Sequence, residues 1–308
     1  MEEFSFAISI FTAAVRISTP ILFAVLGEIF AERSGILNLG LEGMMAMGAL
    51  AGFMGAFYTN NLWFGILAGI AVGGLIGLLM GIMTIGLRLN QTVAGITTTL
   101  FGLGLSAFLF RAIFGIFMSP PRVERFSPIH IPVLSQIPLI GPIFFQHNFF
   151  VYVAFLMVPV CSVILFKTTI GLKIRAVGEN PRTADTLGVN VYRIRYLCII
   201  FCGVLAGLGG AYLSLAELGF FTEGMSAGRG WIAIAIVIFG KWIPSRAFLG
   251  TVFFSIVDSL QLRLQAIGIA VPYQFLVMLP YVLTIIVMVG AYKRAGAPSS
   301  LGIPYKRD

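Results

Sequence analysis

Residues 28–50 read EIFAERSGILNLGLEGMMAMGAL and place Glu28, Glu32 and Asn38 between two long apolar runs. Glycines also punctuate the segment, among them Gly35, Gly40 and Gly43. Glycine lets a chain turn or a helix break, because it has no Cβ atom to clash in left-handed conformations. Asn38 offers both donors and acceptors to a buried backbone or to a solute. The segment therefore predicts a broken helix or a turn between two apolar helices.

The composition of the chain indicates a membrane protein. Of its 308 residues, 58% are hydrophobic and only 10% are charged, whereas charged residues make up about a quarter of a typical soluble domain. Uncharged stretches long enough to span a membrane recur along the chain. A β-barrel would need alternating polar and apolar positions, which runs such as AIAIVIFG (233–240) lack. We expect an all-α fold, a polytopic transmembrane helical bundle with broken helices and lipid around it.

Apolar segments of spanning length predict about eight to ten transmembrane helices. The candidates are 5–27, 39–58, 62–87, 92–114, 148–166, 196–215, about 226–240, 247–262 and 272–291. The segment at 226–240 is short and is expected to be either a full span, a half-helix or a re-entrant piece. The last two are tolerated only where protein or a water-filled cavity covers their backbone.

Basic residues between the apolar segments predict the orientation of the chain. The densest basic cluster lies in 167–195, which the positive-inside rule places in the cytoplasm. The basic C-terminal tail belongs on the same side, and four candidate spans between the two segments agree with this. The proline-rich loop at 115–147 is then expected to be extracellular. The whole chain, 1–308, is expected to form one transmembrane domain, and its net charge of +8 orients helices rather than binding nucleic acid.

Motifs of several enzyme classes are missing from the sequence. A phosphate-binding loop, G-x-x-x-x-G-K-[ST], does not occur, and the one Gly-Lys pair, Gly240-Lys241, is followed by Trp242. The two histidines, His130 and His147, lie in the proline-rich loop and form no metal-ligand motif. We expect no catalytic residue, no metal and no cofactor in this chain, and no ATP hydrolysis by it.

A second polar interruption, GRGWIAIAIVIFGKWIPSRAFLG at 228–250, is built like the first. Paired interrupted helices are a usual sign of a transport pathway. The candidate path residues from these and neighbouring polar positions are Asn38, Glu42, Asn90, Gln91 and Trp231. Trp231 could stack on a base, but a tryptophan at the end of a span is also a common interfacial anchor.

The polar segment GENPRTADTLGVN (178–190) predicts a short capped helix. Asn180 suits the N-cap position, and Pro181 suits the first helical position, where its missing N–H is not needed. Gly188 suits the left-handed residue that follows a helix. The expected helix therefore begins at Pro181 and ends at Leu187.

This helix is too short to be stable alone, so another element must hold it. Ala184 and Leu187 give it one apolar stripe, since residues three apart lie on one helix face. One interpretation is an ordinary solvated loop helix, whose basic neighbours only set the topology. The other is a docking element whose stabilising partner is another polypeptide.

Four segments, in this order, resemble one known family: ERSGILNLGLEGMM (32–45), NQTVAG (90–95), GLKIRAVGENPRTADTLGVNV (171–191) and GRGWIAIAIVIFGKWIP (228–244). Together they resemble the permeases of ABC importers for branched-chain amino acids, simple sugars and nucleosides. The first segment looks most like the nucleoside-type branch. The resemblance extends from residue 15 to residue 290, and Lys241 departs from the small residue that many relatives have there.

The resemblance implies a permease subunit of an ATP-driven importer in a bacterial cell membrane. It implies three kinds of partner: a second permease, a cytoplasmic ATPase and an extracellular solute-binding lipoprotein. It also implies that the short helix within 167–195 is the coupling helix that docks on the ATPase. The residues expected to couple are Gly178, Glu179, Asn180, Pro181, Arg182, Ala184, Asp185 and Gly188.

Nucleosides are the expected substrates, with sugars and other small solutes as alternatives on the same scaffold. Two other classes stay open. One is a secondary transporter driven by an ion gradient, for which carboxylates within or near apolar segments, such as Glu217 and Asp258, would be useful. The other is a membrane scaffold or enzyme that transports nothing.

Overall fold

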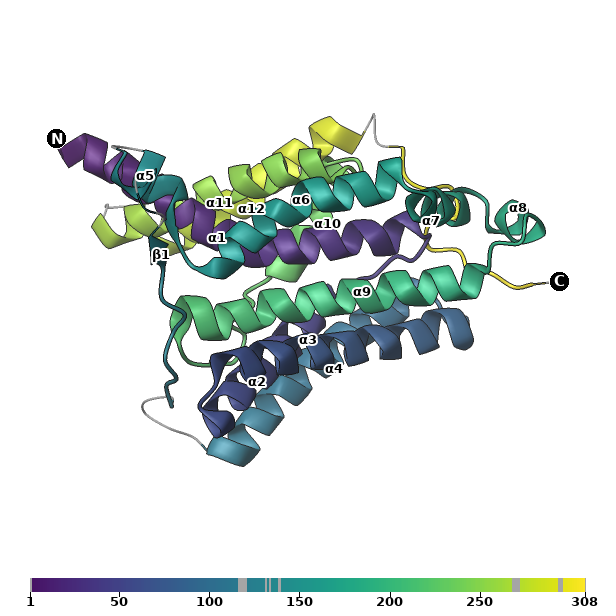
Figure 1. The fold of residues 1–308 in the computed structure, drawn as a ribbon, viewed down its shortest axis with the longest axis horizontal. Coiled ribbons are helices and arrows are strands. Elements are labelled where there is room, and N and C mark those ends of the chain that lie inside the picture. The colour runs from purple at the N-terminus through teal and green to yellow at the C-terminus, as the bar shows by residue number, and fades with distance from the viewer. Residues whose placement is uncertain are drawn as a thin grey trace.

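Helices make up most of the computed structural model, which describes residues 2–115, 121–130, 132, 134–137, 140–267, 272–292 and 296–307 (Figure 1). The helices are α1 (Glu2–Arg33), α2 (Leu41–Thr59), α3 (Leu62–Gly81), α4 (Gln91–Phe114), α5 (Ile140–Phe144), α6 (Phe149–Lys167), α7 (Thr169–Glu179), α8 (Pro181–Thr186), α9 (Val191–Tyr212), α10 (Arg229–Phe239), α11 (Pro244–Ile267) and α12 (Tyr273–Tyr292). Shorter pieces are the π-helices η1 (Ile82–Gly86) and η3 (Leu213–Leu218), the 3-10 turn η2 (Leu134–Gln136), and the antiparallel strands β1 (Ile129–His130) and β2 (Gln146–His147).

Seven helices in the described part of the chain are long and apolar enough to cross a membrane. They confirm the expected polytopic helical bundle. The segment predicted at 226–240 forms α10, which has eleven residues. At 1.5 Å per residue it is about 16 Å long, roughly half of a hydrocarbon core of about 30 Å. It is therefore too short to span. The apolar part of α12, Gln274–Ile286, is likewise shorter than the seven helices of spanning length.

The two ends of the bundle differ in what they carry (Figure 1). The N-terminus, α5 and β1 lie at one end, and α7, α8 and the C-terminus lie at the other. The sequence assigned 167–195 and the C-terminal tail to one side of the membrane, and this arrangement agrees with that assignment. The assignment of that end to the cytoplasm rests on its basic residues and stays a prediction.

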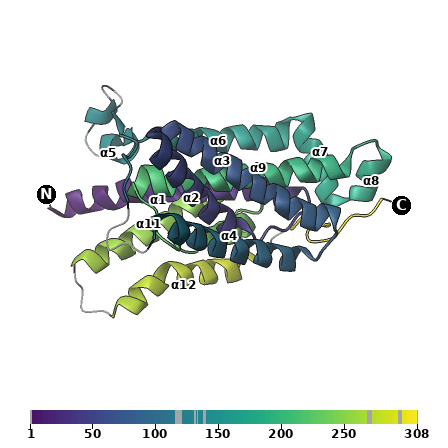
Figure 2. The same cartoon turned by 90° about the horizontal axis from the view of Figure 1, so that it is seen from below.

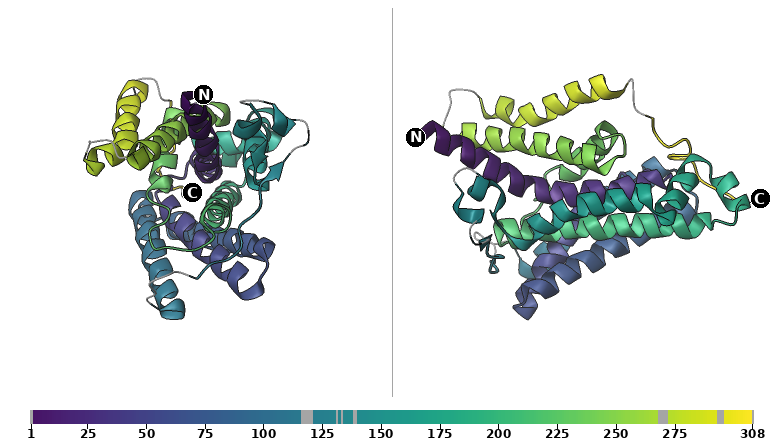
Figure 3. Two further views of the ribbon diagram at one scale, coloured as in Figure 1. Left: turned by 90° about the vertical axis from the view of Figure 1, so that its left-hand side faces the viewer. Right: turned by 45° about the horizontal axis from the view of Figure 1, so that its top comes forward.

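Helix α9 lies at the centre, between α1 and the pair α2 and α3 (Figure 1, Figure 3). Close approach depends on glycine, since a Cβ atom at Gly48 or Gly73 would lie 2.5 or 2.6 Å from the Cα of Gly207. Small residues at such spacing let helices pack tightly in lipid. Helix α12 packs on α10 and α11 at the margin of the bundle (Figure 2). The core that positions the site is therefore α1, α2, α3 and α9.

The first polar interruption forms a buried turn between α1 and α2, as the sequence predicts. Gly35 has a φ of +89°, which favours glycine. However, α1 does not end before this segment but continues to Arg33, so Glu28 and Glu32 lie inside the helix and are fully buried. Their buried carboxyl groups are bound by Asn38, in the turn that follows α1, and by Trp242, which lies far away in the sequence.

Replacing Gly73 by alanine should destabilise the protein, because the added methyl group would collide with the backbone of α9. Overpacking costs about 1–3 kcal/mol, which corresponds to a decrease of about 2 °C or more in the melting temperature of a chain of this size. Gly104→Ala is the matched control, since no neighbouring element lies within 4 Å of its Cβ position. Thermal unfolding of the detergent-solubilised protein measures both. Equal melting temperatures of the Gly73→Ala and Gly104→Ala variants would contradict the close packing of α3 against α9.

Candidate functional site

Helix α8 has the caps that its sequence predicts. The side chain of Asn180 accepts a hydrogen bond from the Thr183 N–H at 3.1 Å, Pro181 occupies the first turn, and Gly188 has a φ of +83°. The helix ends at Thr186, one residue before the predicted Leu187. These caps fix both ends of a two-turn element at the tip of the bundle (Figure 1).

Helix α7, which precedes α8, was not predicted. Its N-cap is Thr168, whose hydroxyl accepts from the Gly171 N–H at 3.2 Å. Ile174 and Val177 are buried on one face, at the spacing of three that a helix requires. A capping threonine followed by this spacing is the signal that could have revealed the helix. The segment predicted to couple is thus a helical pair, α7 and α8, joined at Asn180.

The predicted apolar stripe of α8 is wrong for one of its two residues. Ala184 is 3% exposed and packs with Val177, Val191 and Tyr305, whereas Leu187 is 79% exposed. Because the helix ends before Leu187, this side chain no longer continues the face of Ala184. Leu187 is left as an exposed apolar side chain at the tip of the molecule.

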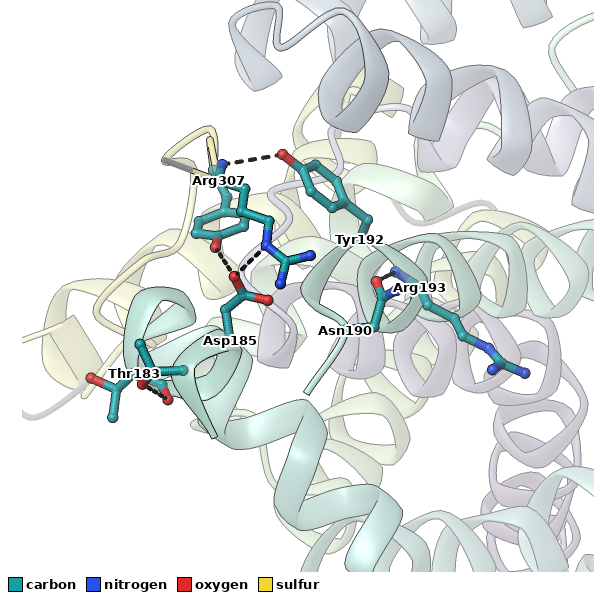
Figure 4. Close-up of polar contacts among 8 residues, drawn as sticks. Thr183, Asp185, Asn190, Tyr192, Arg193 and Arg307 are labelled. Carbon is teal, nitrogen blue, oxygen red and sulfur yellow. Dashed lines mark hydrogen bonds and ion pairs between the residues drawn. The ribbon is translucent and has the colours of Figure 1, made fainter. Parts of the chain in front are cut away.

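The C-terminal segment of the same chain contacts and stabilises α8. The sequence did not indicate this contact and favoured another polypeptide as the partner of the helix. The Tyr305 hydroxyl donates to Oδ2 of Asp185 at 3.0 Å, and Nε of Arg307 lies 3.0 Å from the same oxygen (Figure 4). Burial, with this hydrogen bond, raises the pKa of Tyr305 above the usual value of a tyrosine. The Arg307 N–H donates to the Tyr192 hydroxyl at 3.3 Å. The C-terminal segment therefore holds α8 against α9.

The predicted coupling residues divide into an inner and an outer group. Gly178 and Ala184 are buried, and a Cβ atom at Gly178 would overlap the carbonyl oxygen of Arg33. Pro181 and Asp185 are partly buried. The exposed members are Glu179, Asn180, Arg182 and Gly188. The outer group and Leu187 form the surface that a partner could contact.

Two of the predicted path residues, Asn38 and Glu42, bind other parts of the chain. The Asn38 amide donates to Oε2 of Glu28 at 3.0 Å, and its oxygen accepts from the Gly40 N–H at 2.9 Å. The Glu42 carboxylate accepts from the N–H groups of Gly228 and Gly230, at 2.8 and 2.7 Å. These two N–H groups belong to the start of α10, where the helix dipole favours a negative charge. Glu42 thus fixes the short helix α10 against α2.

The other three path residues differ in their exposure. Gln91 is 2% exposed, and its side-chain oxygen accepts from the Leu37 N–H at 2.7 Å, while its buried Nε2 has no hydrogen-bond partner in the described structure. Asn90 is exposed and caps α4. Trp231 is 42% exposed, next to the residues bound by Glu42. The structure gathers Asn38, Gln91 and Glu42 around the α1–α2 turn and the start of α2. A solute contact for any of the five stays a prediction.

Buried charges around the same turn were not predicted as site residues. Arg195, which the sequence suggested only as a topology signal, is 2% exposed. Its Nε donates to the Ser34 carbonyl at 3.2 Å and its Nη1 to the Ile303 carbonyl at 3.2 Å. The buried carboxylate of Glu32 accepts from the Trp242 indole. Buried charges need such partners, and only the fold reveals which residues supply them.

A polar cavity of 590 Å³ lies at the end of the bundle opposite α8. Its lining includes Arg16, Glu217, His147 and Asn148. Burial lowers the pKa of His147, so its ring is neutral at pH 7, and its Nε2 is 2.8 Å from the Ile143 carbonyl oxygen. The volume lies within the range of about 300–1,000 Å³ typical of small-molecule sites. The cavity can hold a small polar solute.

Comparison with known proteins gives the chain its family. Residues 10–290 match the model of a family described as branched-chain amino acid transport system / permease component. A proposed glucose ABC transporter permease of Haloferax volcanii, TsgC13, is 42% identical over 86% of this chain and 80% of its own length.

Two relatives bear names that refer to nucleosides. The guanosine ABC transporter permease NupQ of Bacillus subtilis is 37% identical over 95% of each chain. The nucleoside ABC transporter permease NupC of Lactococcus lactis is 39% identical over 94% of this chain and 93% of its own. Both relatives therefore align with this chain over nearly their whole length.

A solved structure supports the fold. It is an inward-facing conformation of a proposed metal-chelate type ABC transporter, with a TM-score of 0.52 and 14% identity, and the match covers 92% of this chain and 85% of that chain. With the matches above, the chain belongs to the branched-chain amino acid transport system permease family and is a multi-pass membrane permease subunit of an ABC importer.

Proposed function

We propose that this permease imports nucleosides, with energy from ATP hydrolysis on a separate cytoplasmic ATPase. The observation that carries the coupling part is α8, a capped helix at the tip of the basic end of the bundle, with Arg182 and Leu187 exposed. An exposed leucine suits a protein groove better than water, because burying its side chain is favourable by about 1.5–3 kcal/mol. The phosphate-loop motif missing from the sequence agrees with an ATPase on another chain.

We favour nucleosides as substrates because two relatives that match nearly the full length of this chain have names that refer to guanosine and nucleosides. Trp231 adds a physical reason, because its half-exposed ring can stack on a base, which contributes about 1–3 kcal/mol in base-binding proteins. Glucose is the second candidate, since the Haloferax volcanii relative bears that name.

The remaining partners of the proposed importer are a second permease subunit, related to this one, and an extracellular solute-binding lipoprotein. In the proposed cycle, ATP binding closes the ATPase subunits and displaces the docked α8. A rigid capped helix transmits such a displacement better than a flexible loop, because coupling needs an element with discrete positions. The helices then re-tilt and open the path to the other side of the membrane.

Uptake of a labelled nucleoside by the reconstituted complex should require ATP and should continue after ion gradients are dissipated. A panel of unlabelled nucleosides should compete for uptake, and glucose should not. Vesicles that lack nucleotide are the control. Uptake without nucleotide that collapses with an ion gradient would instead identify a secondary transporter. ATP-dependent uptake of labelled glucose, with no uptake of any labelled nucleoside, would identify a sugar permease.

Leu187→Asp should prevent docking of the ATPase, because it places a charge where an apolar contact is expected. We expect much less ATPase to co-purify with the variant permease and uptake to be lost with it. Ile129→Asp is the matched control, since Ile129 is also an exposed apolar residue but belongs to the loop at the opposite end of the bundle. Normal ATPase co-purification with the Leu187→Asp variant would overturn the docking role of α8.

A further inference from the structure

The last described residues of the chain, 298–307, lie across the end of the bundle that carries α7 and α8 (Figure 1). We call this segment the C-terminal strap. Pro298, Ser300 and Tyr305 of the strap are buried, the last two at 7% and 8% exposed. The segment has no α-helix or β-strand of its own, so its course is set by the side chains and carbonyl groups that it binds.

The first anchor of the strap is the end of α7. The Ser300 N–H donates to the Gly178 carbonyl at 3.0 Å, and the Ser300 hydroxyl donates to the same oxygen at 2.6 Å. The neighbouring Ser299 hydroxyl donates to the Glu179 carboxylate at 2.9 Å. The free carbonyl groups at the end of α7 thus find their partners in the strap, as helix ends require.

The second anchor is the turn that follows α1. The Gly302 N–H donates to the Gly35 carbonyl at 3.3 Å. Buried Arg195 binds both segments at once, through the Ser34 carbonyl in the turn and the Ile303 carbonyl in the strap. A buried guanidinium with only one of these partners would be costly. Arg195 therefore ties the strap to the turn.

The third anchor is α8 itself. The Tyr305 ring packs with Ala184, Val177 and Val191, and its hydroxyl binds Asp185. The ion pair of Arg307 with Asp185 adds little, because the side chain of Arg307 is 67% exposed and exposed pairs contribute about 0–1 kcal/mol. Burial of the Tyr305 ring is thus the main contact between the strap and α8.

We propose that the C-terminal strap is a positioning element that makes α8 and the α1–α2 turn move as one body. Without it, α8 would be held only through α7 and through the start of α9, and a two-turn helix is not stable alone. With it, a displacement of α8 reaches Gly35 and, three residues further along the turn, the predicted path residue Asn38. The proposal rests on the proposed function, since it assumes that α8 docks on the ATPase.

The test uses the complete reconstituted importer and measures solute uptake per ATP hydrolysed. Tyr305→Ala should leave ATPase co-purification intact and lower this ratio about fivefold or more, the size of a typical coupling between sites. Tyr305→Phe keeps the ring and loses only the hydroxyl, so it should recover most of the ratio. Lys306→Ala, at the exposed neighbouring position, is the matched control and should match the parent protein.

Two outcomes would overturn the proposed role of the strap. One is a parental ratio in the Tyr305→Ala variant, and the other is a parallel loss of uptake and hydrolysis with an unchanged ratio. The apparent melting temperature of each variant is measured alongside. If the Tyr305→Ala variant does not fold, Ser300→Ala carries the test, because it removes the hydroxyl bond from the strap to the Gly178 carbonyl and should also lower the ratio. A parental ratio in that variant would contradict the proposal. Failure of the proposed function can be distinguished from failure of the strap proposal. If α8 does not dock on the ATPase, the Leu187→Asp variant retains normal ATPase co-purification.

Discussion

The turn at residues 34–40 imposes the constraint on which the rest of the structure depends. Ser34, Asn38 and several neighbours are fully buried, and buried backbone groups must find hydrogen-bond partners. These partners come from different helices: Arg195 on α9 binds Ser34, Gln91 on α4 binds Leu37, Glu28 on α1 binds Asn38, and Thr99 on α4 binds Leu39. The helices are therefore positioned by one short stretch of backbone, and displacing any of them would leave buried polar groups unpaired.

The same turn lies between the two parts of the molecule that transport would need. On one side, Gly178 packs on Arg33 and the strap binds Gly35, which connects the turn to α7 and α8. On the other side, the chain continues into α2, where Glu42 holds the N-terminus of the short helix α10 next to Trp231. A permease that responds to an ATPase needs such a continuous connection, because coupling travels through packed elements with alternative positions.

What could be predicted from the sequence was the local chemistry. Asn180, Pro181 and Gly188 gave the bounds of α8 to within one residue, because caps depend on neighbouring residues alone, and glycine marked the turn after α1. The unpredicted features depend on tertiary contacts. Glu28 and Glu32 look like residues of a helix break until Asn38 and Trp242 are seen to bind them. Likewise, the exposure of Leu187 and the burial of Arg195 follow from where α8 ends and where the strap runs.

The most direct test of this account measures distances between pairs of spin labels in the complete importer, with and without an ATP analogue. One label stands at exposed Thr183 on α8, and the other at exposed Ile303 on the strap or at exposed Ile129 at the opposite end. If α8 and the turn move as one body, the Thr183–Ile303 distance distribution stays the same while the Thr183–Ile129 distribution shifts. A shift or broadening between Thr183 and Ile303, with Thr183–Ile129 unchanged, would contradict it.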